Sequence, residues 1–165
     1  ITKLRSALPG LILRTTVMVG FPGETDEDFQ ELLEFTKKMA FDRLGCFTFC
    51  PEEGTLAAGM KDQVDPAVAQ ARYEAIMSQQ QGISRKANEA RIGQICDILL
   101  EGISEDGIFF TGRSYGEAPD IDPVIRIAAQ APGHETGDLL RCRIVTAGDY
   151  ELTAVSLEGA YELSE

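Results

Sequence analysis

The stretch "VGFPGETDEDF" (residues 19–29) joins a hydrophobic run to an acidic segment through a turn that contains two glycines and a proline. The run before it, residues 11–19, is rich in β-branched and large apolar side chains, which predicts a buried strand. Thr25 stands three residues before Asp28, the spacing of a capping box, and consecutive acids suit the first turn of a helix. The stretch therefore predicts a strand, a tight turn and an amphipathic helix in direct succession.

A second β-rich run follows the predicted helix at residues 43–49 (RLGCFTF). A strand–helix–strand unit of this kind predicts two parallel strands with the helix packed across the sheet. After an irregular segment, Asp65 and Pro66 are residue types that begin a helix, and a weak apolar stripe continues to about Arg91. The first part of the chain is therefore predicted to be α/β.

Beyond Gly93 the chain changes character, because short β-rich runs alternate with clusters of Gly, Asp, Pro and Glu. The runs occupy residues 94–100, 108–115, 124–129, 139–145 and 150–155. Five strands at this spacing predict a small antiparallel β-barrel. We therefore expect an α/β region followed by an all-β region, with domains at residues 1–91 and 92–165.

The net charge of −12 is concentrated in the second part of the chain. Residues 1–91 hold 11 basic and 13 acidic side chains, whereas residues 92–165 hold four basic and 14 acidic ones. An acidic surface repels nucleic-acid phosphate and favours a basic partner, although solubility alone also explains it. No apolar run approaches the roughly 20 residues of a membrane span. Four cysteines without a disulfide framework favour a reducing, cytoplasmic setting.

The glycine-containing turn raises the question of a ligand. In parallel α/β folds, ligands bind at the carboxyl ends of strands, where this turn and the loop at residues 50–55 are both expected. A phosphate is disfavoured, because the glycine-rich phosphate motifs are missing and Asp26, Glu27 and Asp28 occupy the place of an anion. Three alternatives remain: the acids face a cationic ligand, they only cap the helix, or the glycines serve close packing of the loop.

The segments "RTTVMVGFPGETDEDF" and "RLGCFTFCPEEGTLAA" resemble the fifth and sixth strands of the radical S-adenosylmethionine barrel, a TIM-like barrel, in the methylthiotransferase family. From Ile92 onward the chain is similar to that family's C-terminal TRAM domain, an OB-like β-barrel. The run "GRSYGEAPDID" (residues 112–122) resembles the RimO-type branch, which modifies an aspartate of a small-subunit ribosomal protein. The tRNA-modifying MiaB-type branch tends instead to carry a basic TRAM domain.

The resemblance implies a longer parent enzyme that binds S-adenosylmethionine and two 4Fe-4S clusters. Its cluster motif, CxxxCxxC, is incomplete here: Cys46 and Cys50 have the first spacing, but Glu53 stands where the third cysteine belongs. On a strand these two cysteines would also lie ~13 Å apart, too far for one cluster. We therefore expect no metal ligand and no catalytic residue in this chain, and we expect the cluster motif upstream of Ile1.

In the parent, the implied chemistry is reductive cleavage of S-adenosylmethionine to a radical that takes a hydrogen from an aspartate β-carbon, followed by transfer of a methylthio group. The chain alone would be inactive. Candidates for cofactor binding lie on or just after the two strands: Arg14, Thr16, Gly20, Phe47 and Phe49. The alternatives are a structural ion pair for the arginine, which is expected to be buried, and core positions for the aromatic rings.

The resemblance also places candidate substrate-binding residues in the TRAM domain: Arg113, Tyr115, Glu117, Asp120 and Asp122. Their partner would be the basic ribosomal protein rather than nucleic acid, because the domain is acidic. The two aspartates after Pro119 are equally typical of a turn. Two competing functions are a tRNA-modifying methylthiotransferase and a free-standing OB-like nucleic-acid-binding module, and a purely structural role is a third.

Overall fold

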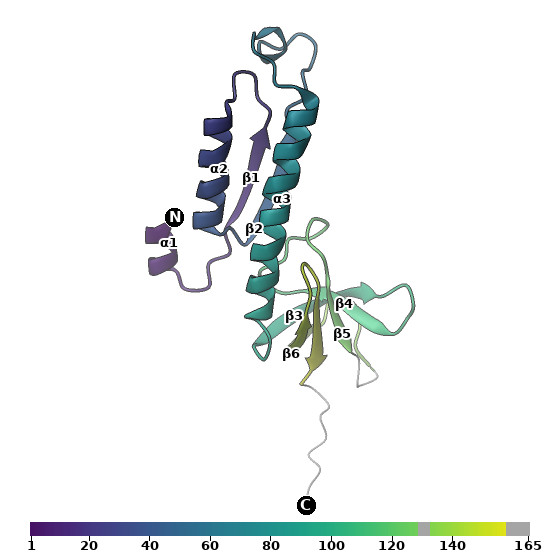
Figure 1. Ribbon diagram of the computed structural model, residues 1–165. Coiled ribbons are helices and arrows are strands. Elements are labelled where there is room, and N and C mark those ends of the chain that lie inside the picture. The colour runs from purple at the N-terminus through teal and green to yellow at the C-terminus, as the bar shows by residue number, and fades with distance from the viewer. Residues whose placement is uncertain (129–132, 158–165) are drawn as a thin grey trace, which may run out of the picture. The chain divides into compact units, whose positions relative to one another are not determined.

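The computed structural model describes residues 1–128 and 133–157 of the 165-residue chain (Figure 1). It divides into two compact units, and the division falls inside a long helix, between Ser84 and Arg85. The elements of the first unit are α1 (Thr2–Ala7), β1 (Arg14–Val19), α2 (Asp26–Met39), β2 (Arg43–Thr48), the 3-10 turn η1 (Ala57–Gly59) and most of α3 (Pro66–Glu89). The second unit contains β3 (Ile95–Ile103), β4 (Phe109–Arg113), β5 (Ile125–Ala128), β6 (Leu139–Ala147) and β7 (Leu152–Ser156).

The start of α2 confirms the predicted capping box. The Thr25 hydroxyl accepts the Asp28 backbone N–H at 3.1 Å, and the Asp28 carboxylate accepts the Thr25 backbone N–H at 2.9 Å. These reciprocal bonds satisfy two backbone donors that a helix N-terminus would otherwise leave free. Lys37 and Lys38 occupy the last turn, where cations stabilise the helix dipole.

Strands β1 and β2 pair in parallel, as predicted, with Thr16 opposite Gly45 and Met18 opposite Phe47. One face of this two-stranded sheet packs against apolar side chains of α2 and α3. The buried members of this core are Val19, Phe29, Cys46 and Ile76.

The other face of the sheet is exposed, so the prediction of a buried strand at residues 11–19 is wrong for one of its two faces. Along β1 the side chains of Arg14, Thr16 and Met18 are exposed, and across the ladder Phe47 is 60% exposed. The expected burial of Arg14 is therefore wrong. Successive strand residues point to opposite faces, and the described chain supplies helices for only one of them.

Polar side chains explain the weak apolar stripe of α3. The Gln79 amide donates to the Thr36 hydroxyl at 2.9 Å, and the Gln80 amide donates to the Phe41 carbonyl at 2.9 Å. Gln80 is only 3% exposed. These glutamines are interior residues that tie α3 to the end of α2, so a hydrophobic pattern alone could not reveal that face.

The five strands of the second unit form a closed barrel in the order β3-β4-β5-β7-β6. Four of the five pairings are antiparallel, but β5 and β7 are parallel, which corrects the prediction of a purely antiparallel barrel. The reason is topological: the chain leaves β5, forms β6 on the far side of β7, and turns back into β7 in the direction of β5.

Inward-facing side chains of β3, β5, β6 and β7 fill this barrel, and the partly buried Phe110 of β4 packs against them. The buried core consists of Ile98, Leu100, Ile125, Ile127, Leu140, Cys142, Ile144, Leu152 and Ala154. Gly112 is required where β4 approaches β3, because a Cβ at that position would overlap the Leu99 carbonyl oxygen. Among the residues that the structure describes, no helix has the length and apolar character needed to cross a bilayer.

Candidate functional site

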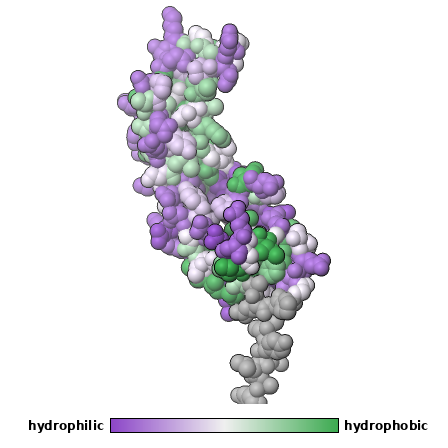
Figure 2. Space-filling view, turned by 90° about the vertical axis from the view of Figure 1, so that its right-hand side faces the viewer, coloured by the Kyte–Doolittle hydropathy of each residue, from purple (hydrophilic) through white to green (hydrophobic). Residues whose placement is uncertain are grey.

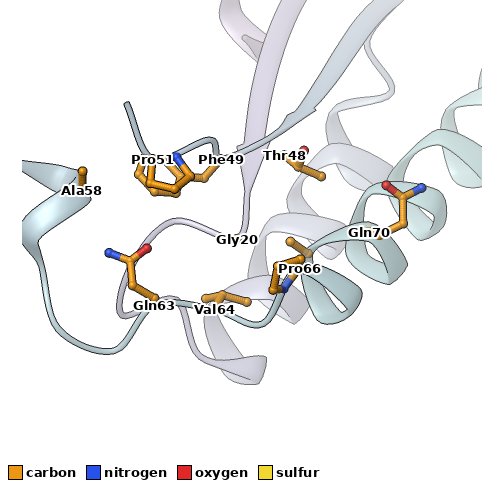
Figure 3. Close-up of a pocket in the computed structure, with 10 residues that line it drawn as sticks. Gly20, Thr48, Phe49, Pro51, Ala58, Gln63, Val64, Pro66 and Gln70 are labelled. Atoms are coloured by element: carbon orange, nitrogen blue, oxygen red, sulfur yellow. The ribbon is translucent and has the colours of Figure 1, made fainter. Parts of the chain in front are cut away.

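A cavity of about 460 Å³ opens at the carboxyl ends of β1 and β2 (Figure 3). Figure 3 shows Phe49 and Pro51 on one side of it and Val64 and Pro66 on the opposite side. The remaining lining residues are Gly20, Thr48, Ala58, Gln63, Ala69 and Gln70. None of these side chains is charged, so the cavity suits an uncharged, partly apolar group with polar edges that the two glutamine amides can bind.

Gly20 also lines the cavity, and the backbone conformation and packing at this position require a glycine. Its φ of +78° lies in the left-handed region, and a Cβ there would be 2.5 Å from the Cβ of Ala69 on α3. Its backbone N–H donates to the Glu24 carboxylate at 2.9 Å. Close packing, one of the three explanations left open by the sequence, therefore accounts for the glycine.

Two acidic residues at the turn, Glu24 and Asp26, form ion pairs with an arginine of the same chain. Arg72 of α3 lies 2.6 Å from the Glu24 carboxylate and 2.7 Å from that of Asp26, and its guanidinium is 5.5 Å from the centre of the Phe29 ring. The Arg72 side chain is 7% exposed and that of Glu24 is 11% exposed. Burial alone would lower the pKa of Arg72, but hydrogen bonds and charges from the two carboxylates outweigh it and raise that pKa.

Arg72 and Glu24 are the residues that sequence reasoning missed. They stand 48 positions apart, so no local spacing connects them. Glu24 joins the turn to α3, since one carboxylate oxygen accepts the Gly20 N–H and the other accepts a hydrogen bond from the Arg72 guanidinium. The arrangement holds the turn that forms the floor of the cavity against α3.

The structure separates the five predicted cofactor-binding residues into two groups. Gly20 and Phe49 line the cavity, and the Phe49 ring contacts Phe21 edge to face with centroids 5.2 Å apart. Arg14, Thr16 and Phe47 do not line it; they lie on the open face of the sheet. A ligand that used all five would have to extend from the cavity onto that face.

The two cysteines near the cavity differ in environment. Cys46 is 6% exposed within β2, whereas β2 ends at Thr48 and Cys50 lies exposed beyond it. Burial, and to a smaller degree the Glu24 carboxylate, raises the pKa of the Cys46 thiol to about 11. In residues 1–128 and 133–157, no group of three or more His, Cys, Asp or Glu side chains could hold a metal ion.

In the barrel unit, the predicted substrate-binding residues lie on or beside the loop that follows β4. The buried Glu117 carboxylate contacts the Arg91 guanidinium at 2.6 Å and accepts the backbone N–H of Ser114 at 3.0 Å. Desolvation by burial would raise the pKa of Glu117, but hydrogen bonds from Arg91 and Ser114 and the charge of Arg91 lower it overall. The buried Glu117 therefore stabilises the loop through its contacts with Arg91 and Ser114.

The other four residues lie nearer the surface. Arg113 contacts Glu101 at 2.6 Å, and the Tyr115 side chain is 77% exposed. Asp120 is exposed and has a φ of +61°, a backbone conformation typical of a turn aspartate. The Asp122 carboxylate accepts the backbone N–H of Ala118 at 2.7 Å, so the second aspartate stabilises the turn as well.

Both units are similar in sequence to known proteins. Residues 92–156 match the TRAM domain family. Over 151 residues, or 92% of the chain, it is 49% identical to the ribosomal protein uS12 methylthiotransferase RimO of Desulforudis audaxviator. It is also 46% identical over 93% of its length to the RimO of Pelotomaculum thermopropionicum, and 43% identical over 96% to that of Trichlorobacter lovleyi. The chain belongs to the RimO-type methylthiotransferase family.

The chain spans about a third of the length of these relatives, 33% to 35% for the three named. The RimO-type similarity runs through both units, so it covers the cavity at β1 and β2 as well as the loop after β4. The TRAM match begins at residue 92, directly after Arg91, whose guanidinium holds Glu117 in that loop.

Proposed function

We propose that the chain contributes part of the catalytic barrel and the substrate-binding module of a ribosomal-protein aspartate methylthiotransferase of the radical S-adenosylmethionine type. The observation that carries the proposal is 40% to 49% identity, over more than nine tenths of the chain, to proteins named ribosomal protein uS12 methylthiotransferase. A role in the cytoplasm follows, because ribosomal proteins are synthesised and assembled there.

The cavity beside Gly20 and Phe49 is proposed to receive the adenine end of S-adenosylmethionine. Its chemistry fits this group, since it is uncharged, has an aromatic ring on one wall, and offers amides at Gln63 and Gln70 to a base edge. Its volume of about 460 Å³ falls within the usual range for small-molecule sites. When bound, this cofactor supplies the radical and the methyl group.

The open face of the sheet would then bind the rest of the cofactor. Arg14 provides a cation for a carboxylate, Thr16 provides a hydroxyl, and Phe47 offers an exposed ring on the neighbouring strand. These three residues act by binding and orienting. The described residues do not fit an iron–sulfur cluster, because they bring together no set of ligands for one. No step is therefore assigned to a cluster on this chain.

The TRAM domain is proposed to bind the basic ribosomal protein through the loop after β4. Residues 92–165 carry 14 acids and four basic side chains, which favours a basic protein and opposes RNA. Arg113, Tyr115, Asp120 and Asp122 lie at or near the surface of this region, while Glu117 supports it from beneath.

Binding of the whole 165-residue chain to purified ribosomal protein uS12, and separately to tRNA, tests this proposal at two salt concentrations. We expect binding to uS12 that weakens as salt rises, and no measurable binding to tRNA. Salt-sensitive binding to tRNA without binding to uS12 would favour the tRNA-modifying alternative and overturn the proposed partner.

A further inference from the structure

Two apolar side chains of the loop after β4 are unusually exposed. Tyr115 is 77% exposed and Ile121 is 72% exposed, the highest values for large hydrophobic residues in the described part of the barrel unit. In the space-filling view of Figure 2, apolar residues likewise reach the surface of this unit among hydrophilic ones. Both side chains therefore leave apolar surface in contact with water, and a partner that covered them would gain from the hydrophobic effect.

The loop that carries them is held in one conformation by its own hydrogen bonds. Ser114 and Glu117 close its first half, where the Ser114 hydroxyl donates to the Glu117 carboxylate at 2.5 Å and accepts from Arg91 at 3.0 Å. Ala118 and Asp122 close its second half, through a backbone bond of 3.1 Å and the carboxylate contact already described. A loop ordered before binding pays little conformational entropy when a partner arrives.

The negative charge around Tyr115 and Ile121 favours a positively charged partner. Asp120 directly precedes Ile121 and is exposed, and the whole unit is strongly acidic. An arginine side chain satisfies both features at once, because its guanidinium can stack on a tyrosine ring while it pairs with a carboxylate. An acidic or nucleic-acid partner would meet repulsion at the same place.

We infer that residues 114–122 form a preformed docking surface on which Tyr115 and Ile121 anchor an arginine-bearing segment of a basic protein. This inference rests on the proposed function and deepens it, since it names Tyr115 and Ile121 as the anchors within the loop after β4 and an arginine-bearing segment as the part of the substrate protein that they bind. The cluster of Arg91 with the buried Glu117 and Ser114 positions the surface, and Asp120 supplies its charge.

The test measures affinity of the full chain for purified uS12 with Tyr115→Ala, Ile121→Ser and a matched control, Ile108→Ser. Ile108 lies in the β3–β4 loop and is 65% exposed, so the control makes the same chemical change on a similarly exposed isoleucine of the same unit. We expect each anchor variant to bind about 10-fold more weakly and the control to stay within about 2-fold of the unchanged chain.

A second readout separates the anchors from the charge. Asp120→Asn should reduce the dependence of affinity on salt, whereas the two anchor variants should weaken binding with the salt dependence unchanged. Equal weakening by Ile108→Ser and Ile121→Ser, or no weakening by either anchor variant, would overturn the assignment to this loop while leaving the proposed function standing. Failure of the unchanged chain to bind uS12 would overturn both.

Discussion

The two-stranded sheet of β1 and β2 and the five-stranded barrel of β3 to β7 are built from similar β-rich sequences, yet only the barrel closes its sheet around a core, whereas the two-stranded sheet buries one face against helices. In the barrel, Ile98 and Ile127 are inaccessible to water because neighbouring strands close around them. In the sheet, Met18 is 51% exposed and Phe47 is 60% exposed. A strand's apolar composition therefore indicates which side chains can be buried, whereas the strands that close the barrel and the helices that cover one face of the sheet decide which of them are.

Replacing a strand glycine with alanine in each unit tests whether the barrel strands are packed more tightly than β1 and β2. Gly112→Ala in the barrel places a Cβ against the Leu99 carbonyl oxygen and the Ile98 side chain, so we expect a loss of about 3 kcal/mol or more in unfolding free energy. Gly45→Ala in the sheet places a Cβ 3.8 Å from the Thr16 hydroxyl, which is an ordinary contact. Its effect should stay within about 0.5 kcal/mol.

Urea unfolding followed by far-ultraviolet circular dichroism measures both glycine variants. A similar loss for the two would mean that β1 and β2 pack as tightly as the barrel strands. The open face described above would then be incorrect.

The second prediction compares the buried ion pair between Arg72 and Glu24 with the exposed ion pairs of Arg85. Arg72→Met leaves Glu24 buried without its cation, and we expect the first unit to lose about 3 kcal/mol, because breaking a buried ion pair strands a charge. Arg85→Met is the matched control, since Arg85 is 61% exposed on the same helix and pairs with Glu89 and Asp149. Its loss should be much smaller.

Hydrogen exchange of α2 and of the turn at residues 20–24 locates the effect of Arg72→Met. Faster exchange confined to these segments is the expected result. Unchanged exchange there would refute the role of Arg72 in holding the turn.

A third prediction concerns the pH dependence of barrel stability. The pKa of Glu117 is lowered in the folded chain from its ordinary value of 4.5, so its stabilising contribution is complete above about pH 4.5 and is lost as pH falls through the folded pKa. Glu117→Gln should therefore be less stable than the unchanged chain at pH 7, and the difference should shrink in acid. Glu105→Gln, on an exposed loop, should show neither effect.

Thermal unfolding from pH 7 to pH 3 measures this difference. A constant gap between Glu117→Gln and the unchanged chain across that range would show that the Glu117 charge is not what stabilises the loop after β4.

The last prediction, which leaves the stability of the fold unchanged, distinguishes the two cysteines near the cavity. Thiolate is the reactive form, and with a pKa of about 11 only on the order of 0.1% of Cys46 is ionised at pH 8. Cys46 is also buried, whereas Cys50 is exposed. We expect N-ethylmaleimide to modify Cys50 at least about 100-fold faster, as measured by peptide mass spectrometry. Equal rates would mean that β2 opens readily, which would weaken the contrast between its two faces.

Local patterns in the sequence were sufficient for α2, α3 and the seven strands in their order, whereas the short elements α1 and η1 were not predicted from them. The Thr25 and Asp28 spacing located the start of α2, and the spacing of β-rich runs after Gly93 located the barrel strands. These features depend on contacts within a few residues, so they are readable from the chain alone. The cavity could be predicted only as a place, the carboxyl ends of two parallel strands, because that follows from topology.

The partners of individual side chains could not be predicted in this way. Asp26, Glu27 and Asp28 were compatible with an external cation or with capping alone. Asp28 caps α2, and Asp26 pairs with Arg72, whose distance along the chain removes any local signal. Glu117 was a surface candidate by motif, yet it lies buried against Arg91. Such pairs are selected by packing between elements, and packing geometry is absent from the order of residues.

The order of residues was enough to establish the α/β and all-β regions, the capped helix, the parallel pairing of β1 with β2, the acidity of the second region and the resemblance to methylthiotransferases. Packing of the folded chain was needed to show that one face of the β1–β2 sheet is exposed, that β5 and β7 run parallel, and that Tyr115 and Ile121 are exposed. The physical reason is that propensity, capping and charge belong to single residues and their near neighbours, whereas burial belongs to surfaces that form when distant segments meet.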